Sequence, residues 1–387
     1  MNRIKSIDLL RGLVMIIMTI DHCRDLTGSE FITTGPTNLQ TTTVALFFTR
    51  WITHLCAPTF VFLSGVSAFL LTQRRNNLPE SRRFLISRGI WLVIINFTIN
   101  NFGIFFDIHF NIFFFQVIAA IGFGLIGLGL MLKLPAKTIA LIGLLIIFTH
   151  NLLDGIAFPG HPTINLIWTM FMGSGFFEIT KNHSMLITYP IIPWLGVAMA
   201  GFGFGSLFNQ AIEKRKKVFL KIAAVTLLLF VIIRGINIYG DPARWSVQHS
   251  GVFSFLSFIN TTKYPPSLLF ILMTLGISVL VLSFTDGIEN RLTAIISTYG
   301  KAPLFYWSLH WFVIHFAAIA VFLFQGFSWQ QLQFTGFGMG RPEKGGGLGL
   351  PGMYLVWICI VAILYPVCKW FNAYKQQHRD RKWVHYI

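Results

Sequence analysis

Acidic residues and cysteines are scarce in this sequence. The chain of 387 residues has 14 Asp and Glu and four Cys, and only 11% of its residues are charged. Four scattered cysteines are too few for a disulfide framework or a zinc site, although a bridge between Cys23 and Cys56 stays open. The sequence also has no phosphate-binding loop and no catalytic pair of carboxylates. We therefore expect no metal, and the chain lacks the signatures of zinc hydrolases, P-loop nucleotidases and glycosidases.

Hydrophobic and aromatic residues are abundant instead. They include 40 Phe and 11 Trp, 54% of the chain is hydrophobic, and the mean hydropathy is +0.66. This composition is typical of a polytopic membrane protein without a separate soluble part. We predict an all-α fold in which residues 1–387 form a single transmembrane domain of about ten transmembrane helices. The apolar runs long enough to cross a bilayer are 7–25, 52–72, 86–106, 110–132, 136–153, 186–208, 218–238, 265–284, 302–324 and 353–373.

The basic residues indicate how these helices are oriented. With the N-terminus in the cytoplasm, the inner loops hold most of the 30 Lys and Arg, including the runs 74–75 and 214–217. This distribution follows the positive-inside rule with both termini cytoplasmic. The net charge of +16 is therefore a topology signal and does not predict nucleic-acid binding. A further apolar segment, 164–177, is too short to cross, and we interpret it as re-entrant or interfacial.

Three residues inside the first apolar run are the most informative: Asp8, Arg11 and His22. Charged side chains are costly inside a bilayer and are usually functional there. In a helix, the eleven residues from Arg11 to His22 make about three turns, so both lie on one face, roughly 16 Å apart. Asp8 lies one turn before Arg11 and can pair with it. We expect one polar stripe with an ion pair near one end and an imidazole near the other.

Short motifs along the chain resemble a known family. The segment 6–12 (SIDLLRG), followed by Asp21 and His22, resembles the opening of bacterial membrane proteins similar to heparan-α-glucosaminide N-acetyltransferase. The spacing from Arg11 to His22 also resembles that of the broader membrane acyltransferases that modify envelope sugars. The other matching segments, in chain order, are 50–58 (RWITHLCAP), 60–65 (FVFLSG), 189–196 (YPIIPWLG), 263–267 (KYPPS) and 300–306 (GKAPLFY).

The resemblance implies an enzyme of the bacterial cytoplasmic membrane. Such an enzyme would move an acetyl group from cytosolic acetyl-CoA to an extracytoplasmic acceptor, an amino sugar or sugar hydroxyl of an envelope glycan. In the eukaryotic members, the histidine regarded as catalytic lies in the loop before the second span. His54 lies only four residues before Pro58, nearer the span than in that pattern, whereas His22 fits the envelope-sugar acyltransferases.

These considerations assign candidate roles to individual residues. A histidine can take a proton from an acceptor amine or hydroxyl, or accept an acyl group itself. A guanidinium suits a phosphate or a thioester carbonyl. We predict that Arg11, oriented by Asp8, binds the donor. The predicted catalytic residues are His22 first and His54 second, with Asp21 beside His22, and the predicted substrate-binding residues are His310, Tyr306, Lys263 and Trp194.

Two other classes of protein fit the same residues. A proton-coupled transporter would use the intramembrane His and Arg as a proton relay. A membrane assembly or sensor protein would keep the fold without turnover. Within an enzyme, Asp8 and Arg11 could instead only stabilise a helix crossing, and His22 could be a hydrated histidine at a helix end.

Overall fold

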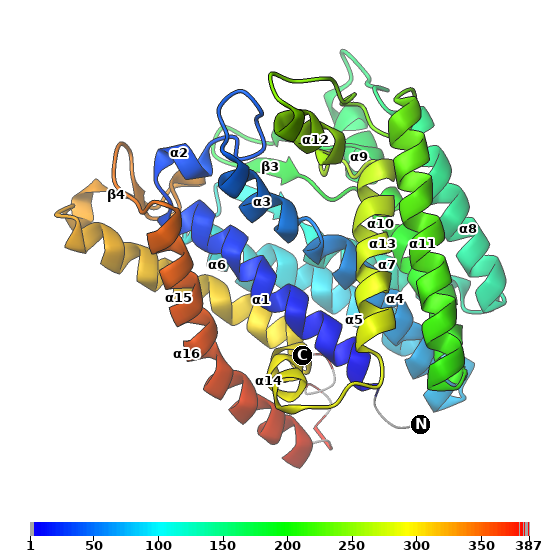
Figure 1. Cartoon of the computed structure of the whole chain (residues 1–387). Coiled ribbons are helices and arrows are strands. Elements are labelled where there is room, and N and C mark those ends of the chain that lie inside the picture. Colours follow the sequence, from blue (N-terminus) through cyan, green and yellow to red (C-terminus); the bar gives the residue numbers. More distant parts are fainter. Residues whose placement is uncertain (1–3, 379, 382, 384–385, 387) are drawn as a thin grey trace.

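The computed structural model describes residues 4–378, 380–381, 383 and 386, which form a bundle of long helices (Figure 1). Among these residues, eight helical segments are long and apolar enough to cross a membrane. The predicted all-α polytopic fold is therefore confirmed. The eight segments are Val44–Arg75, Leu78–Phe105, Ala136–Leu153, Ile191–Asn209, Ile212–Ile236, Leu268–Thr285, Pro303–Phe324 and Leu350–Gln377.

Two further helices occupy the remaining predicted spans. Helix α1 (Lys5–Thr27) has 23 residues, enough to cross a bilayer, but Asp8, Arg11 and Asp21 make it less apolar than the others. Helix α7 (Val117–Met131) is apolar but has only 15 residues. The ten predicted runs thus correspond to eight clear candidate spans and these two helices.

The eight segments contain ten α-helices and short stretches of other helix. A turn of π-helix, η1 (Asn96–Asn100), joins α5 to α6, and the 3-10 turns η2 (His150–Leu153) and η3 (Gly205–Asn209) extend α8 and α10. The α-helices are α3 (Val44–Thr53), α4 (Cys56–Arg75), α5 (Leu78–Ile95), α6 (Asn101–Phe105), α8 (Ala136–Thr149), α10 (Ile191–Phe204), α11 (Ile212–Ile236), α13 (Leu268–Thr285), α15 (Pro303–Phe324) and α16 (Leu350–Gln377).

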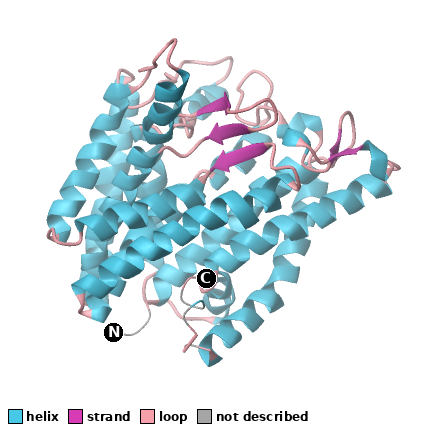
Figure 2. Ribbon diagram, turned by 180° about the vertical axis from the view of Figure 1, so that it is seen from behind, coloured by secondary structure: helices cyan, strands magenta, loops and turns pink. Residues whose placement is uncertain are grey.

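The two sides of the bundle differ. Helix α1 begins and α16 ends on one side, here called the inner side, together with α14 (Arg291–Gly300) (Figure 1). The opposite, outer side carries the short elements and the strands (Figure 2). These outer elements are α2 (Glu30–Thr33), α9 (Pro162–Met172), α12 (Gly251–Ile259), the turns η4 (Trp329–Gln331) and η5 (Gly336–Gly338), and the paired strands β4 (Leu332–Gln333) and β5 (Arg341–Pro342).

A small outer sheet corrects one predicted span. Strands β1 (Ile112–Phe115), β3 (Ser184–Ile187) and β2 (Gly175–Glu178) pair in the order β1-β3-β2. The run predicted as a helix over 110–132 is therefore helical only from Val117. Asn101 on α6 fixes the strand, because its amide donates to Ile112 O and accepts from Phe114 N, both at 2.8 Å. The segment 164–177 falls on α9 and β2, and it does not cross the bundle.

Helix α1 is mostly buried among other helices of the bundle. It packs against α3, α4, α13, α14, α15 and α16. Its crossing with α14 is very close, because a Cβ added to Gly12 would lie 2.0 Å from Ile296 O. Its outer end is held by Arg341, which donates to the carbonyls of Asp25, Leu26 and Gly28 at 2.7–2.9 Å. A cation on the last carbonyls of a helix is a favourable C-cap.

All four cysteines are free. The disulfide between Cys23 and Cys56 that the sequence left open is therefore not formed, and both of these cysteines are buried. Helix packing, and not a cross-link, therefore holds the outer end of α1 in place.

Candidate active site

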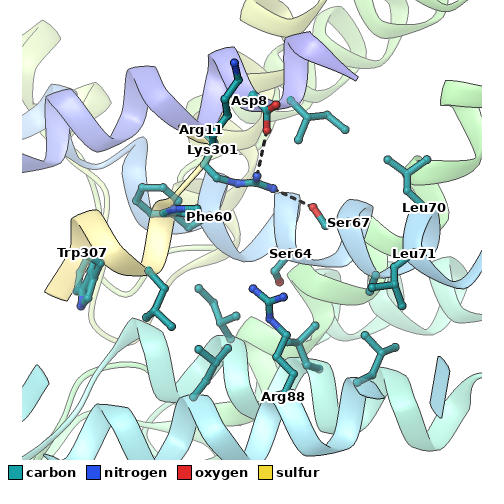
Figure 3. Close-up of a pocket in the computed structure, with 18 of the residues that line it drawn as sticks. Asp8, Arg11, Phe60, Ser64, Ser67, Leu70, Leu71, Arg88, Lys301 and Trp307 are labelled. Atoms are coloured by element: carbon teal, nitrogen blue, oxygen red, sulfur yellow. Dashed lines mark hydrogen bonds and ion pairs between the residues drawn. The ribbon is translucent and has the colours of Figure 1, made fainter. Parts of the chain in front are cut away.

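Arg11 is held at the inner half of α1 by three groups. Its guanidinium donates to Ser67 Oγ on α4 at 2.8 Å and to Gly300 O at 3.4 Å. It also lies 3.6 Å from Asp8 Oδ1, so the ion pair expected from the spacing is present. These contacts fix the direction of the guanidinium, and Figure 3 shows those with Asp8 and Ser67. A planar guanidinium with a fixed direction also has the geometry to bind a phosphate or carboxylate.

A large cavity opens beside Arg11. Its volume is about 1000 Å³, and its walls come from α1, α4, α5, α7, α15 and α16. This lies at the upper end of the range of small-molecule sites, about 300–1,000 Å³. The mouth lies on the inner side, because Arg74, Arg75, Lys301 and Lys375 line it from helix ends on that side. A single acid, Asp8, is found among the described lining residues.

The cavity is strongly basic. Arg88 projects from α5 toward Ser64, and Arg11 projects from α1 on the opposite wall (Figure 3). Two guanidinium groups that face one cavity repel each other and therefore favour a bound anion. The six basic residues of the lining are Arg11, Arg74, Arg75, Arg88, Lys301 and Lys375. Their side chains provide far more positive charge than Asp8 balances.

Trp307 on α15 connects this cavity to His22. The indole lines the cavity, and its ring lies edge-on to the imidazole of His22, with centroids 5.6 Å apart. His22 itself is not among the cavity-lining residues. The cavity therefore reaches from Arg11 to the aromatic ring that touches His22, which corresponds to the stripe expected along α1.

His22 is half-buried and tightly oriented. Its Nδ1 lies 2.6 Å from Nε2 of His310 on α15. Its ring stacks on Trp311 with centroids 3.9 Å apart and an interplanar angle of 22°. The stacking fixes the plane of the imidazole, and the hydrogen bond fixes its rotation within that plane. The other ring nitrogen therefore points in a fixed direction, which general-base chemistry needs.

Asp21 belongs to a separate ionic cluster at the outer end of α1. Its carboxylate pairs with Arg50 of α3 and with Arg24 at 2.9 Å. Both of its oxygens therefore face guanidinium groups and not the imidazole of His22. In this geometry Asp21 organises the junction of α1 and α3, and its predicted catalytic role stays a prediction.

His54 occupies the break between α3 and α4. It is buried, lies edge-on to Phe270 at 5.5 Å, and interacts electrostatically with Arg50, Lys263 and Asp21. Its Nδ1 has no hydrogen-bond partner among the described residues. A buried polar atom without a partner is rare and needs an explanation, so His54 stays a second candidate.

The predicted substrate-binding residues fall in different places. His310, Tyr306 and Trp194 are fully buried, so none of them presents a surface in this structure. Tyr306 shares a hydrogen bond with Thr19 of α1 at 2.6 Å, and Trp194 packs against Tyr189. Lys263 lies over the ring of its neighbour Tyr264, outside the transmembrane helices.

Several residues of the site were not singled out from the sequence. The sequence indicated only membrane orientation for Arg74, Arg75, Arg88 and Lys301. A sequence alone does not distinguish a basic residue in a cytoplasmic loop from one that binds an anionic ligand. Trp307 was not considered, although it directly follows the motif 300–306. Its position three residues before His310 places both on the same face of α15, which is the signal that could have found it.

Within the described residues, no group of three or more His, Cys, Asp or Glu could hold a metal ion. The lining of the cavity instead suits an anionic organic ligand.

A comparison with models of known protein families identifies the family of this chain. The family model described as heparan-alpha-glucosaminide N-acetyltransferase, catalytic, matches residues 3–239, more than half of the chain. No curated protein matches the chain. The matched range includes Asp8, Arg11, His22, His54 and the helices that carry them, and the family is one of membrane acetyltransferases. This chain belongs to the heparan-alpha-glucosaminide N-acetyltransferase family.

Proposed function

We propose that this protein transfers an acetyl group from acetyl-CoA, bound in the basic inner cavity, to an amino or hydroxyl group of a glycan that approaches from the outer side. The observation that carries the proposal is the short distance from the cavity to His22. Trp307 lines the cavity together with six basic residues, and its ring lies edge-on to the oriented imidazole of His22.

The charge of the cavity suits the donor. Coenzyme A carries several phosphate charges at one end and its thioester at the other end of a long, thin arm. The basic residues at the mouth match the phosphates, and Arg11 and Arg88 lie deeper, where polar atoms of the arm or the thioester carbonyl would pass. The positive-inside rule assigns this mouth to the cytoplasm, where acetyl-CoA is made.

His22 supplies the acid–base chemistry of the transfer. Its Nε2 takes the proton from the acceptor N–H or O–H as the acceptor atom bonds to the thioester carbonyl carbon. The carbon–sulfur bond then breaks, the electron pair leaves with sulfur, and the proton on His22 passes to the thiolate. The products are the acetylated acceptor and CoA thiol, and His22 returns to its starting state.

His54 supports an alternative assignment at the outer end of the same site. Its unpartnered Nδ1 and the charges of Arg50 and Lys263 would suit an acceptor that enters between α3 and the loop before α13. In that arrangement Lys263 would contact the acceptor. An acetylated histidine on the way to product is compatible with either residue.

The proposal is tested with purified protein in lipid nanodiscs, radiolabelled acetyl-CoA and a glycan that ends in α-linked glucosamine. We expect labelled acetyl-glycan and an equal amount of free CoA thiol. Binding of acetyl-CoA without turnover on glycan amines or hydroxyls would instead indicate an assembly or sensor protein. Solute flux into proteoliposomes without acetyl-CoA would indicate a transporter and overturn the proposal.

A further inference from the structure

His310 has a defined proton position. Its Nδ1 lies 3.1 Å from the carbonyl oxygen of Tyr306, one turn earlier on α15. A carbonyl oxygen only accepts hydrogen bonds, so the Nδ1 of His310 must carry the proton. In the neutral ring, Nε2 then keeps its lone pair and is an acceptor.

This acceptor fixes the proton of His22. The Nδ1 of His22 lies 2.6 Å from Nε2 of His310 and must donate to it. The neutral His22 ring therefore has its free lone pair on Nε2. A chain of two hydrogen bonds, from the backbone of α15 to His310 to His22, thus selects the tautomer that a general base needs.

Aromatic rings hold this pair in place. Trp311 stacks on His22, and Trp307 lies edge-on to it. Tyr306 lies nearly parallel to His310, with centroids 5.6 Å apart and an interplanar angle of 10°. When His22 takes a proton, the positive charge develops over the π face of Trp311, which attracts cations.

In the part of the chain that the structure describes, no carboxylate makes a hydrogen bond to the ring of His22. The charged or titratable groups that act on His22 are His310 on α15, Asp21 on its own helix, Arg50 on α3 and Lys263 before α13. Asp21 is already bound by Arg24 and Arg50. Of these four described residues, His310 makes a hydrogen bond to His22.

We propose that His310 is the positioning residue of the acetyl transfer: its buried imidazole accepts the Nδ1 proton of His22 and keeps the Nε2 of His22 free to take the proton of the acceptor. The inference rests on the proposed function and deepens it. It replaces a substrate-binding role for His310 with one that its complete burial allows.

The test compares variants in the nanodisc assay with acetyl-CoA and the glucosamine-terminated glycan. His310→Phe keeps a ring of similar size but accepts no hydrogen bond. We expect kcat to fall about 10- to 100-fold, the scale typical for loss of a group that orients a functional histidine, with the affinity for acetyl-CoA unchanged. His310→Gln offers a side-chain carbonyl in place of Nε2, and we expect it to recover part of kcat.

His315→Phe is the matched control. His315 is an equally buried histidine on α15 whose Nε2 donates to Ile104 O at 3.0 Å, so this variant also loses a buried imidazole. We expect it to lower thermal stability while kcat stays near the wild-type value.

The outcomes separate the two proposals. Wild-type kcat in His310→Phe would overturn the positioning role while the proposed function stands. Equal loss of kcat and acetyl-CoA binding in the Phe and Gln variants would mean that His310 is only structural, and would also overturn it. Absence of acetyl transfer by the wild-type protein would overturn the proposed function and this inference with it.

Discussion

Arg88 shows how the meaning of a single residue depends on its surroundings. In the sequence it is one of several arginines near an inner loop, where it indicates orientation. In the structure its side chain enters the basic cavity on the wall opposite Arg11 (Figure 3). A charge inside a cavity interacts with a ligand far more strongly than a charge on a solvated loop.

Arg88→Ala is expected to weaken donor binding. A hydrogen bond to a charged group contributes about 1.5–3 kcal/mol, so the dissociation constant for acetyl-CoA should rise about 10- to 100-fold. Equilibrium binding of radiolabelled acetyl-CoA to purified protein measures it. Arg83→Ala is the control, because Arg83 is exposed on the same helix and does not line the cavity. Equal effects of the two substitutions would mean that Arg88 acts only through overall charge.

The candidate site could be predicted in part. The Asp8–Arg11 pair and the alignment of Arg11 with His22 follow from helical periodicity, which is local. The partners of His22 lie on α15, nearly 300 positions further along the chain, and no local pattern brings them together. His54 and Lys263 were predicted individually, but their proximity to the Asp21 cluster depends on how α3 and α13 pack against α1.

At the scale of elements, the crossing of α1 and α14 sets the position of Arg11. Gly12 and Gly300 face each other, and a Cβ added to Gly300 would lie 1.9 Å from Asp8 O. Small residues at such a crossing let two backbones approach closely in a membrane. The same crossing brings Gly300 O within reach of Arg11, so helix packing and the proposed donor site depend on one contact.

Gly12→Ala is therefore expected to destabilise the fold and misplace Arg11. Overpacking of this kind costs about 1–3 kcal/mol, and the melting temperature in detergent should fall together with acetyl-CoA affinity. Gly235→Ala on α11 is the matched control, since a Cβ there meets nothing within 4 Å. That variant should melt at or slightly above the wild-type temperature, because alanine favours a helix over glycine. If Gly12→Ala melted like the control, the close crossing would not exist in solution.

Elements were predicted best where the hydrophobic run was long and uninterrupted. Helices α11, α13, α15 and α16 fall close to the expected runs. The error over 110–116 arose because Phe-rich apolar residues suit a strand as well as a helix. Distant contacts decide between the two: β1 pairs with β3, and the amides of Asn96 and Asn101 bind its backbone. The run predicted over 52–72 also differs from the structure, because the helix already begins with α3 at Val44 and breaks at His54 and Leu55.

For the whole molecule, the distribution of charge predicts which side faces the cytoplasm. Glu213 lies exposed at the inner start of α11, and Glu343 lies exposed in the outer loop between β5 and α16. Glu343→Cys should react with a membrane-impermeant maleimide added to intact cells, and Glu213→Cys should react only after the cells are opened. The unsubstituted chain gives the background, because Cys359 is exposed while the other three cysteines are buried. The reverse pattern would place the basic cavity on the wrong side for cytosolic acetyl-CoA.

The whole account depends on His22 as the group that moves the proton at the end of the donor cavity. The most direct measurement is acetyl transfer by His22→Ala and His54→Ala beside the wild-type protein, with acetyl-CoA binding measured in each. The account predicts that His22→Ala binds acetyl-CoA normally and loses at least about 100-fold in turnover, the lower range for a general base, while His54→Ala keeps more activity. Wild-type turnover in His22→Ala, with activity lost only in His54→Ala, would contradict it.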